Sequence, residues 1–166
     1  MWEFFLGDIM NADEIIRLLD LKPHPEGGFY RETYRSSTTL PGPSQRAHST
    51  AIYYLLVPGA ISRMHRLKSD EIFHFYMGDP VTWVLLTKGE PARKVVLGGS
   101  LAEGQQVQMV VPAGTWFGGS LNDGGKYALM GTTVAPGFEF EDFEIGGREE
   151  LLKAFPQAEK EIMRLS

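Results

Sequence analysis

Two side chains near the middle of the sequence could do chemistry together. His65 and Glu71 lie six residues apart in the run ISRMHRLKSDEIFHFY, which is rich in apolar residues. A neutral imidazole can take up a proton near neutral pH, and a buried carboxyl group beside it can return one or orient a ligand. The pair therefore favours an acid–base or ligand-binding role, and the alternative is a buried hydrogen-bonded pair without activity.

The same two residues could instead be ligands of a metal ion. Catalytic zinc usually has three protein ligands, and non-heme iron takes two histidines and a carboxylate. His74 could join His65 and Glu71 only if a bulge changed the direction of its side chain. We therefore expect no bound metal, and one divalent ion held by these three residues is the alternative.

The composition of the 166-residue chain predicts a single domain built mainly from strands. Its 43% hydrophobic content is enough for one core, and its 19 Gly and 10 Pro are spread as in short strands joined by turns. Strands are expected at residues 29–35, 49–57, 61–66, 71–76, 81–87, 92–97, 107–111 and 127–134. Helices are expected at 11–21, 148–154 and 156–165. One domain should cover 1–166, with a barrel core at about 25–146.

Charge and residue usage exclude several classes of protein. A formal net charge of -5 argues against nucleic acid as a partner. The sequence has no cysteine, no apolar run long enough for a membrane span and no basic start typical of a secretory signal, so we expect a cytoplasmic protein. A solvated strand edge is expected at the acidic residues Glu139, Glu141, Asp142 and Glu144.

Alternation along the strands predicts which side chains share the barrel interior. If His65 and Glu71 point inward, His74 points the other way. The other residues expected to face inward from these strands are Arg63, Leu67, Phe73 and Phe75. An apolar interior with a few convergent polar groups is typical of a small-molecule pocket.

The stretch from Gly59 to Gly78 resembles the first motif of the cupin superfamily. His65 and Glu71 occupy two ligand positions of that motif, but Leu67 stands where it has a second histidine. In the segment VPAGTWFGG, Phe117 stands where the histidine of the second cupin motif belongs. The resemblance implies an all-β, double-stranded β-helix, the cupin jelly-roll barrel, in which two metal-ligand positions have been lost.

Longer segments resemble one branch of that superfamily, the Cupin_5 family. The chain contains, in the order and spacing of that family, PEGGFYRETYRS, STAIYYLL, HRLKSDEIFHFYMGDP, VVPAGTWF and TVAPGFEFEDFE. The resemblance implies a barrel with short N-terminal and C-terminal helices, commonly a homodimer, and no settled activity. A homodimer is also favoured by the aromatic residues Trp2, Phe4 and Phe5.

A more distant similarity suggests a mechanism. The segments GGFYRETY and YALMGTTVAPGFE are similar to the sugar-nucleotide 3,5-epimerases, which are metal-free cupins. That similarity implies that His65 is the catalytic base and that Tyr30 and Glu32 lie on a swapped N-terminal strand, which reaches the ligand across a dimer. The tyrosine that those enzymes carry just before a proline is missing here, because Ala135 precedes Pro136.

Three functions agree with these residues. The leading hypothesis is a cupin that binds a small polar metabolite, of the sugar or nucleotide-derivative type, and isomerises or epimerises it without a metal. Its catalytic residues would be His65 and Glu71, and its ligand-binding residues would be Tyr30, Glu32, Arg63, Phe73 and Phe117. The alternatives are a metal-dependent cupin enzyme, such as a dioxygenase or isomerase, and a non-catalytic ligand-binding module.

Overall fold

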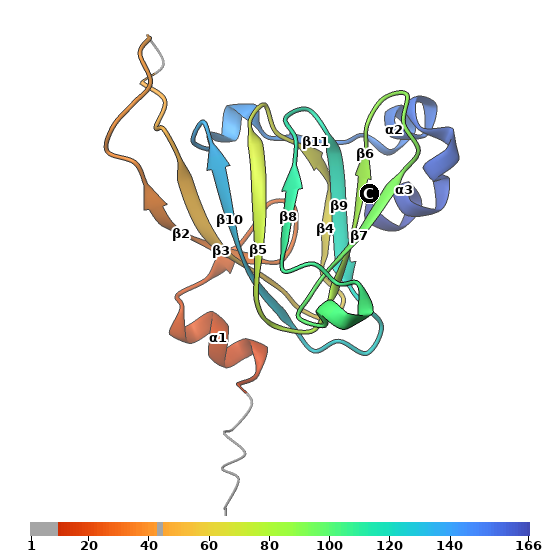
Figure 1. Ribbon diagram of the computed structural model, residues 1–166, viewed down its shortest axis with the longest axis horizontal. Helices are drawn as coiled ribbons and strands as arrows, with labels where there is room; N and C mark the ends of the chain where they lie inside the picture. Colours follow the sequence, from red (N-terminus) through yellow and green to blue (C-terminus); the bar gives the residue numbers. More distant parts are fainter. Residues whose placement is uncertain (1–9, 43–44) are drawn as a thin grey trace, which may run out of the picture.

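A computed structural model describes residues 10–42 and 45–166, most of which form two antiparallel sheets (Figure 1). The six-stranded sheet has the order β1 (Lys22–Pro23), β2 (Phe29–Arg35), β3 (Thr50–Leu56), β10 (Ala128–Ala135), β5 (Asp70–Gly78) and β8 (Gln108–Val111). The five-stranded sheet has the order β11 (Glu144–Ile145), β4 (Ile61–Arg66), β9 (Trp116–Leu121), β6 (Val81–Leu86) and β7 (Arg93–Leu97). The predicted all-β jelly roll is confirmed.

Short helices lie at both ends of the described chain, as predicted. Helix α1 (Ala12–Leu18) begins with a capping box, in which Asn11 and Glu14 satisfy each other's backbone N–H groups. The chain ends with α2 (Arg148–Ala154), the 3₁₀ turn η3 (Pro156–Ala158) and α3 (Glu159–Leu165). The two other 3₁₀ turns are η1 (Leu101–Glu103) and η2 (Phe140–Asp142). No helix of the described residues is long and apolar enough to cross a membrane.

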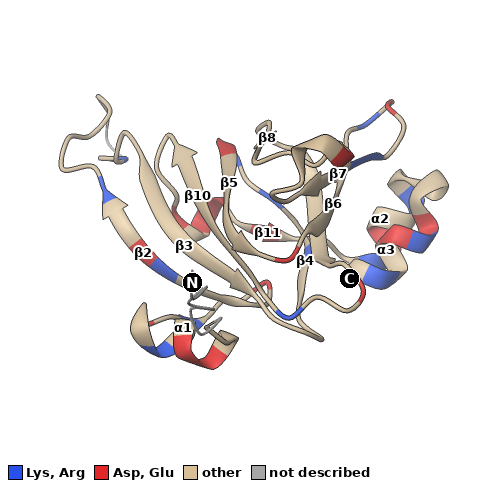
Figure 2. Cartoon of the chain, turned by 60° about the horizontal axis from the view of Figure 1, so that its bottom comes forward, with Lys and Arg blue, Asp and Glu red and all other residues tan. Residues whose placement is uncertain are grey.

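Both signs of charge occur on the helices, whereas most strand residues are uncharged (Figure 2). This distribution follows from packing, because each helix covers one apolar patch of a sheet and leaves its other side to water. In α3, Ile162 and Leu165 are buried against residues of the five-stranded sheet, including Met64 and Val84. Trp2, Phe4 and Phe5, which the sequence analysis uses to favour a homodimer, lie outside the described part of the chain.

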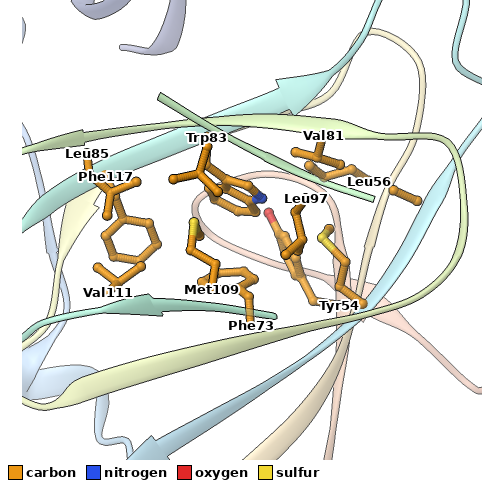
Figure 3. Close-up of a cluster of buried hydrophobic side chains, with 13 residues drawn as sticks. Tyr54, Leu56, Phe73, Val81, Trp83, Leu85, Leu97, Met109, Val111 and Phe117 are labelled. Carbon is orange, nitrogen blue, oxygen red and sulfur yellow. The ribbon is translucent and has the colours of Figure 1, made fainter. Parts of the chain in front are cut away.

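The main core lies between the two sheets and is built on aromatic rings (Figure 3). Trp83 of β6 is fully buried, with its ring centroid 4.4 Å from that of Phe73 on β5 and 6.0 Å from that of Phe117 on β9. Because these rings come from both sheets, their contacts hold the sandwich together. They also form the packed wall behind the site described below.

An irregularity in β4 changes which of its side chains face inward. Ser62 pairs with Gly119 and His65 pairs with Phe117, so two residues of β4 oppose the single residue Gly118. This β-bulge reverses the alternation within the strand. Ser62 and His65 are therefore both buried, and Arg63 is exposed. The prediction that Arg63 faces the interior together with His65 is wrong for this reason.

Strand β9 is the one long strand that the sequence pattern does not predict. Its centre holds Gly118 and Gly119, and glycine weakens the signal of a strand. A Cβ atom at position 118 would lie 2.8 Å from the carbonyl oxygen of Ser62, and one at position 119 would lie 2.7 Å from the ring of Trp83. The glycines are therefore needed for the close approach of β9 to the β4 bulge and to the core.

Candidate functional site

A cavity of about 130 Å³ lies beside the packed core, against the inner face of the six-stranded sheet. Tyr54 and Phe73 belong both to the core and to the cavity wall. The other aromatic rings of the wall are Tyr30, Phe138, Phe140 and Phe143, and its ionisable side chains are His24, Glu26, Glu32, Arg35, His65, Glu71 and Glu139. This apolar wall with a few polar groups is the usual composition of a ligand site.

His65 is held rigidly at the cavity by contacts to both ring nitrogens. It is 2% exposed, and its Nδ1 lies 2.6 Å from the carbonyl oxygen of Arg63. Because a carbonyl only accepts hydrogen bonds, Nδ1 carries a proton and Nε2 faces the carboxylate oxygen Oε2 of Glu26 at 3.0 Å. A hydrogen bond between Nε2 and Oε2 requires one further proton on either atom. The ring also packs on Phe117, with 4.1 Å between centroids.

Glu26 reaches the cavity from a tight loop that precedes β2. Gly27 has a φ of +119°, and a Cβ there would lie 1.9 Å from the carbonyl oxygen of Ile61, so only glycine fits. The backbone N–H of Arg63 donates to the carbonyl of Glu26 at 3.0 Å and fastens the loop to β4. The side chain of Glu26 is also fixed to β4, because the hydroxyl of Ser62 donates to its Oε1 at 2.7 Å. Both carboxyl oxygens are thus engaged.

His24 lies on the far side of Glu26 as a neutral ring. Its Nδ1 accepts the backbone N–H of Glu26 at 3.2 Å, which leaves that nitrogen without a proton. Burial lowers the pKa of His24, although the charge of Glu26 opposes the shift, so the 3.5 Å approach of Nδ1 to Oε2 is not an ion pair. The ring meets Tyr30 edge-on, with 4.7 Å between centroids. His24 therefore orients the Glu26 loop and forms part of the wall.

Glu71 is the polar group of the site that lacks a full set of partners. It is 7% exposed, and its Oε2 has no hydrogen-bond partner among the described residues. Burial raises its pKa to about 8, the negative charge of Glu26 adds to the increase, and a hydrogen bond with the Thr132 side chain opposes it. Glu71 is thus protonated in the empty cavity at neutral pH and has an oxygen left to bind a ligand.

The mouth of the cavity carries a three-residue ion-pair network. Arg35 donates to both carboxylate oxygens of Glu32, at 3.0 and 2.9 Å, and to Glu139 Oε1 at 2.7 Å. Nearby, Asp142 binds Arg46 and, at 3.1 Å, Lys68, while Glu144 pairs with Arg66. The acidic residues expected to be a solvated edge are therefore largely ion-paired. They tie the segment that contributes Phe138, Phe140 and Phe143 to the rest of the sandwich.

The structure brings together only some of the residues singled out in the sequence. Tyr30, Glu32, His65, Glu71 and Phe73 all line the cavity. Phe117 lies in the core behind His65, and the exposed Arg63 donates through its guanidinium to the carbonyl of Pro25. No hydrogen bond or ion pair joins the described side chains of His65 and Glu71 to each other.

The direct partner of His65, Glu26, was not singled out, and neither was His24. In the sequence these two residues follow a predicted helix and look like part of a loop that simply ends it. A signal does exist in the run PEGG, because two consecutive glycines next to a lone acidic residue indicate a close backbone approach. The sequence therefore indicates that the backbone of this loop makes a close approach, but it does not indicate which strand the loop contacts.

The described residues do not fit a cupin metal centre. His74 lies on the outer face of β5, where its ring nitrogens face Thr133 and Gln108 at 3.2 Å. In residues 10–42 and 45–166, no group of three or more His, Asp or Glu side chains could hold a metal ion. Both nitrogens of His65 are already occupied, by Arg63 and Glu26. These contacts leave no three-residue donor set around the cavity.

The strand that carries Tyr30 and Glu32 belongs to the six-stranded sheet. Strand β2 pairs antiparallel with β3 of the same chain, with Tyr30 opposite Tyr54 and Glu32 opposite Ile52. Both side chains reach the cavity of their own chain. The exchange of this strand between two subunits, implied by the similarity to sugar-nucleotide epimerases, stays a prediction.

Comparisons with known proteins agree with this architecture. The Cupin_5 family, described as "Cupin superfamily (DUF985)", matches residues 13–146. An uncharacterized protein of Saccharomyces cerevisiae is 29% identical in an alignment of 166 positions, which covers 90% of this chain and 82% of that protein. A hypothetical protein from Leishmania major is 34% identical, with a TM-score of 0.88 over 95% of this chain and 99% of that chain. A protein from Shewanella oneidensis is 40% identical, with a TM-score of 0.88 over 95% and 98%. The chain therefore belongs to the Cupin_5 family of the cupin superfamily.

Proposed function

We propose that this protein binds a small polar metabolite in the barrel cavity and moves a proton on it without a metal ion, as an isomerase or epimerase does. The observation that carries this proposal is that the close pair of His65 and Glu26 and the unpartnered oxygen of Glu71 are located at one aromatic-walled cavity. Perturbed, convergent titratable groups in a cavity are characteristic of active sites.

The geometry supports separate roles for the two halves of the site. With Nδ1 held by the Arg63 carbonyl, Nε2 is the ring nitrogen of His65 that can exchange a proton with a ligand carbon, once the bound ligand has displaced the Glu26 carboxyl group from it. A histidine oriented in this way contributes about 10²–10⁴-fold to a proton transfer. Glu71 does not touch His65 and therefore acts on another part of the ligand, which it binds and orients through Oε2. A dioxygenase or another metal-dependent enzyme is disfavoured because three metal ligands do not converge.

A hydrogen-exchange experiment tests the proposed chemistry. A metabolite library rich in carbonyl compounds is incubated with the protein in D₂O, and mass spectrometry detects deuterium gained at carbon. The wild type should label at least one metabolite, and His65→Asn should label it about 100-fold more slowly. His48→Asn is the control, because His48 is exposed and its Nε2 meets only the Thr39 carbonyl. Equal rates for wild type and His65→Asn would refute the catalytic role of His65, and saturable binding without labelling would indicate a non-catalytic module.

The proposal extends to the setting in which the protein works. The resemblance to the Cupin_5 family supports a homodimer, and the absence of cysteine suits a reducing, cytoplasmic environment.

A further inference from the structure

The charged side chains of the cavity wall are predominantly acidic. Four carboxyl groups line the cavity, those of Glu26, Glu32, Glu71 and Glu139, and Arg35 is the one lysine or arginine among the described lining residues. The guanidinium group of Arg35 is already paired with carboxylates, because it donates two hydrogen bonds to Glu32 and one to Glu139. An anionic ligand would therefore enter a negative field without a free cation to receive it.

The unpartnered oxygen of Glu71 requires a polar partner from the ligand. Glu71 Oε2 is buried and lines the cavity, so leaving it unpaired is costly. The ionisable groups that act on Glu71 are Glu26, from the loop before β2, and Tyr54, from β3. Beyond Glu26 lie His65 of β4 and the neutral His24. None of these groups supplies a positive charge directly to Glu71.

The remaining wall is aromatic and suits a positive charge. Phe138 contacts Phe140 edge-on, with 5.0 Å between centroids, and lies 6.4 Å from Phe143. Tyr30 and Phe140 both flank the ring of His24, at 4.7 and 6.5 Å. Ring faces attract organic cations, and several rings together form the aromatic cages that bind ammonium groups.

From the acidic wall, the unpartnered Glu71 oxygen and the aromatic rings, we infer that the ligand is an organic amine whose ammonium group binds Glu71. This inference rests on the proposed function and narrows the polar metabolite to an amine-bearing one, such as an amino sugar. The rest of the ligand extends toward His65, the base of the proposed reaction. A phosphorylated nucleotide derivative does not fit, because Arg35, the one lysine or arginine among the described lining residues, is already paired with Glu32 and Glu139.

The pH dependence of binding follows from the same contact. Glu71 is mostly protonated at pH 7, because its pKa in the empty cavity is about 8. An ammonium ion favours the ionised carboxylate, so binding releases a proton from Glu71. The affinity for an ammonium ligand should accordingly rise about tenfold between pH 7 and pH 9 and should then level off. A neutral ligand should show no such rise.

Three probes of equal shape test the charge of the ligand by isothermal titration calorimetry. They are cyclohexylmethylammonium, cyclohexylmethanol and cyclohexanecarboxylate, which share one ring and differ in charge. At pH 9 the ammonium should bind at least tenfold more tightly than the alcohol, a difference of about 1.4 kcal/mol, and the carboxylate should bind most weakly. Glu71→Gln should remove the preference for the ammonium and its pH dependence. Glu141→Gln should change neither, because Glu141 is exposed and outside the cavity.

Several results would overturn the inference. They are equal or tighter binding of the alcohol or the carboxylate, an ammonium affinity that does not change between pH 7 and pH 9, and no binding of any probe at millimolar concentration. If Glu71→Gln does not fold, the pH dependence of the wild type still decides the question. If the protein shows no preference for the ammonium probe but still labels a metabolite with deuterium, only the inferred ligand class is refuted. Ammonium preference without labelling would refute the proposed catalysis alone.

Discussion

The barrel interior has a packed region and an open region, and each contains a buried polar atom that has no partner among the described residues. The two regions differ in what surrounds that atom. In the packed region, Trp83 Nε1 lies among apolar side chains that fill the space between the sheets (Figure 3). In the open region, Glu71 Oε2 lines a cavity next to the His65–Glu26 pair. An unpaired indole N–H is a cost that tight packing offsets, whereas an unpaired carboxyl group beside open space is prepared for a ligand.

The comparison teaches that burial alone does not identify a functional group in this fold. Phe73 and Tyr54 contact both regions, so the packed aromatic core forms the rigid back wall of the cavity. A rigid wall can hold His65 and Glu71 in place although they do not touch each other. If this division is correct, changes in the packed region should mainly affect stability, and changes in the open region should affect stability in a pH-dependent way.

The largest expected effect is in the packed region. Trp83→Ala removes a fully buried indole that contacts Phe73 and Phe117, and it should lower the free energy of unfolding by about 3–5 kcal/mol through the cavity that it leaves. Urea denaturation monitored by circular dichroism measures the loss. Leu101→Ala, at a position 63% exposed, is the control and should change stability by about 0.5 kcal/mol or less. A loss below about 1 kcal/mol for Trp83→Ala would show that this region is not tightly packed.

The next effect concerns the open region and depends on pH. The folded-state pKa of Glu71, about 8, lies above the reference value of 4.5, so the folded protein binds the proton more tightly than the unfolded chain. The contribution of this group is therefore complete below pH 4.5 and is lost as the pH rises through 8. Between pH 5 and pH 9 the wild type should lose about 4 kcal/mol relative to Glu71→Gln, which carries no charge at either pH.

Urea denaturation of both proteins across this pH range measures that difference. Glu103→Gln is the matched control, because Glu103 is exposed and its removal should leave the curve parallel to that of the wild type. Parallel curves for Glu71→Gln and the wild type would contradict the assignment of Glu71 as a buried, protonated carboxyl group. The distinction between the two regions would then lose its electrostatic basis.

Much of the packed region could be predicted from the sequence, because its signals are local. Alternation and turn residues predict β2, β4 and β5, and the pattern of α2 predicts its bounds. The same alternation indicates that Glu71 and Phe73 share one face. These elements depend on periodicity within a few residues, which the sequence contains directly.

The sequence predicts less of the open region, because this region depends on contacts between segments that lie far apart in the chain. The bulge that exposes Arg63 arises where β4 pairs with β9, a strand that has no clear signal of its own. The pairing of His65 with Glu26 joins two segments through the approach of Gly27 to Ile61. No periodicity encodes such an approach, so the cupin-like motif indicates His65 but not the residue that it contacts.

The smallest expected effect lies at the segment that supplies phenylalanine rings to the cavity. Asp142 is 9% exposed and binds Arg46 and Lys68, which lower its pKa, with the Arg46 hydrogen bond as the main cause. Its folded-state pKa lies below the reference value of 3.8, so its contribution is present above pH 4 and is lost as the pH falls through the lowered value. Asp142→Asn should therefore cost about 1 kcal/mol at pH 7 and less at pH 2.

Thermal unfolding at the two pH values measures this effect, and Glu141→Gln is the control. Glu141 binds the same arginine at 3.3 Å, but its side chain is 74% exposed, so its loss should be barely detectable. Equal losses for the two variants would mean that Asp142 is an ordinary surface charge. A larger loss for Asp142→Asn, together with weaker binding of the ammonium probe, would show that this ion pair holds the aromatic segment over the cavity. The open region would then depend on charge at its rim as well as at its centre.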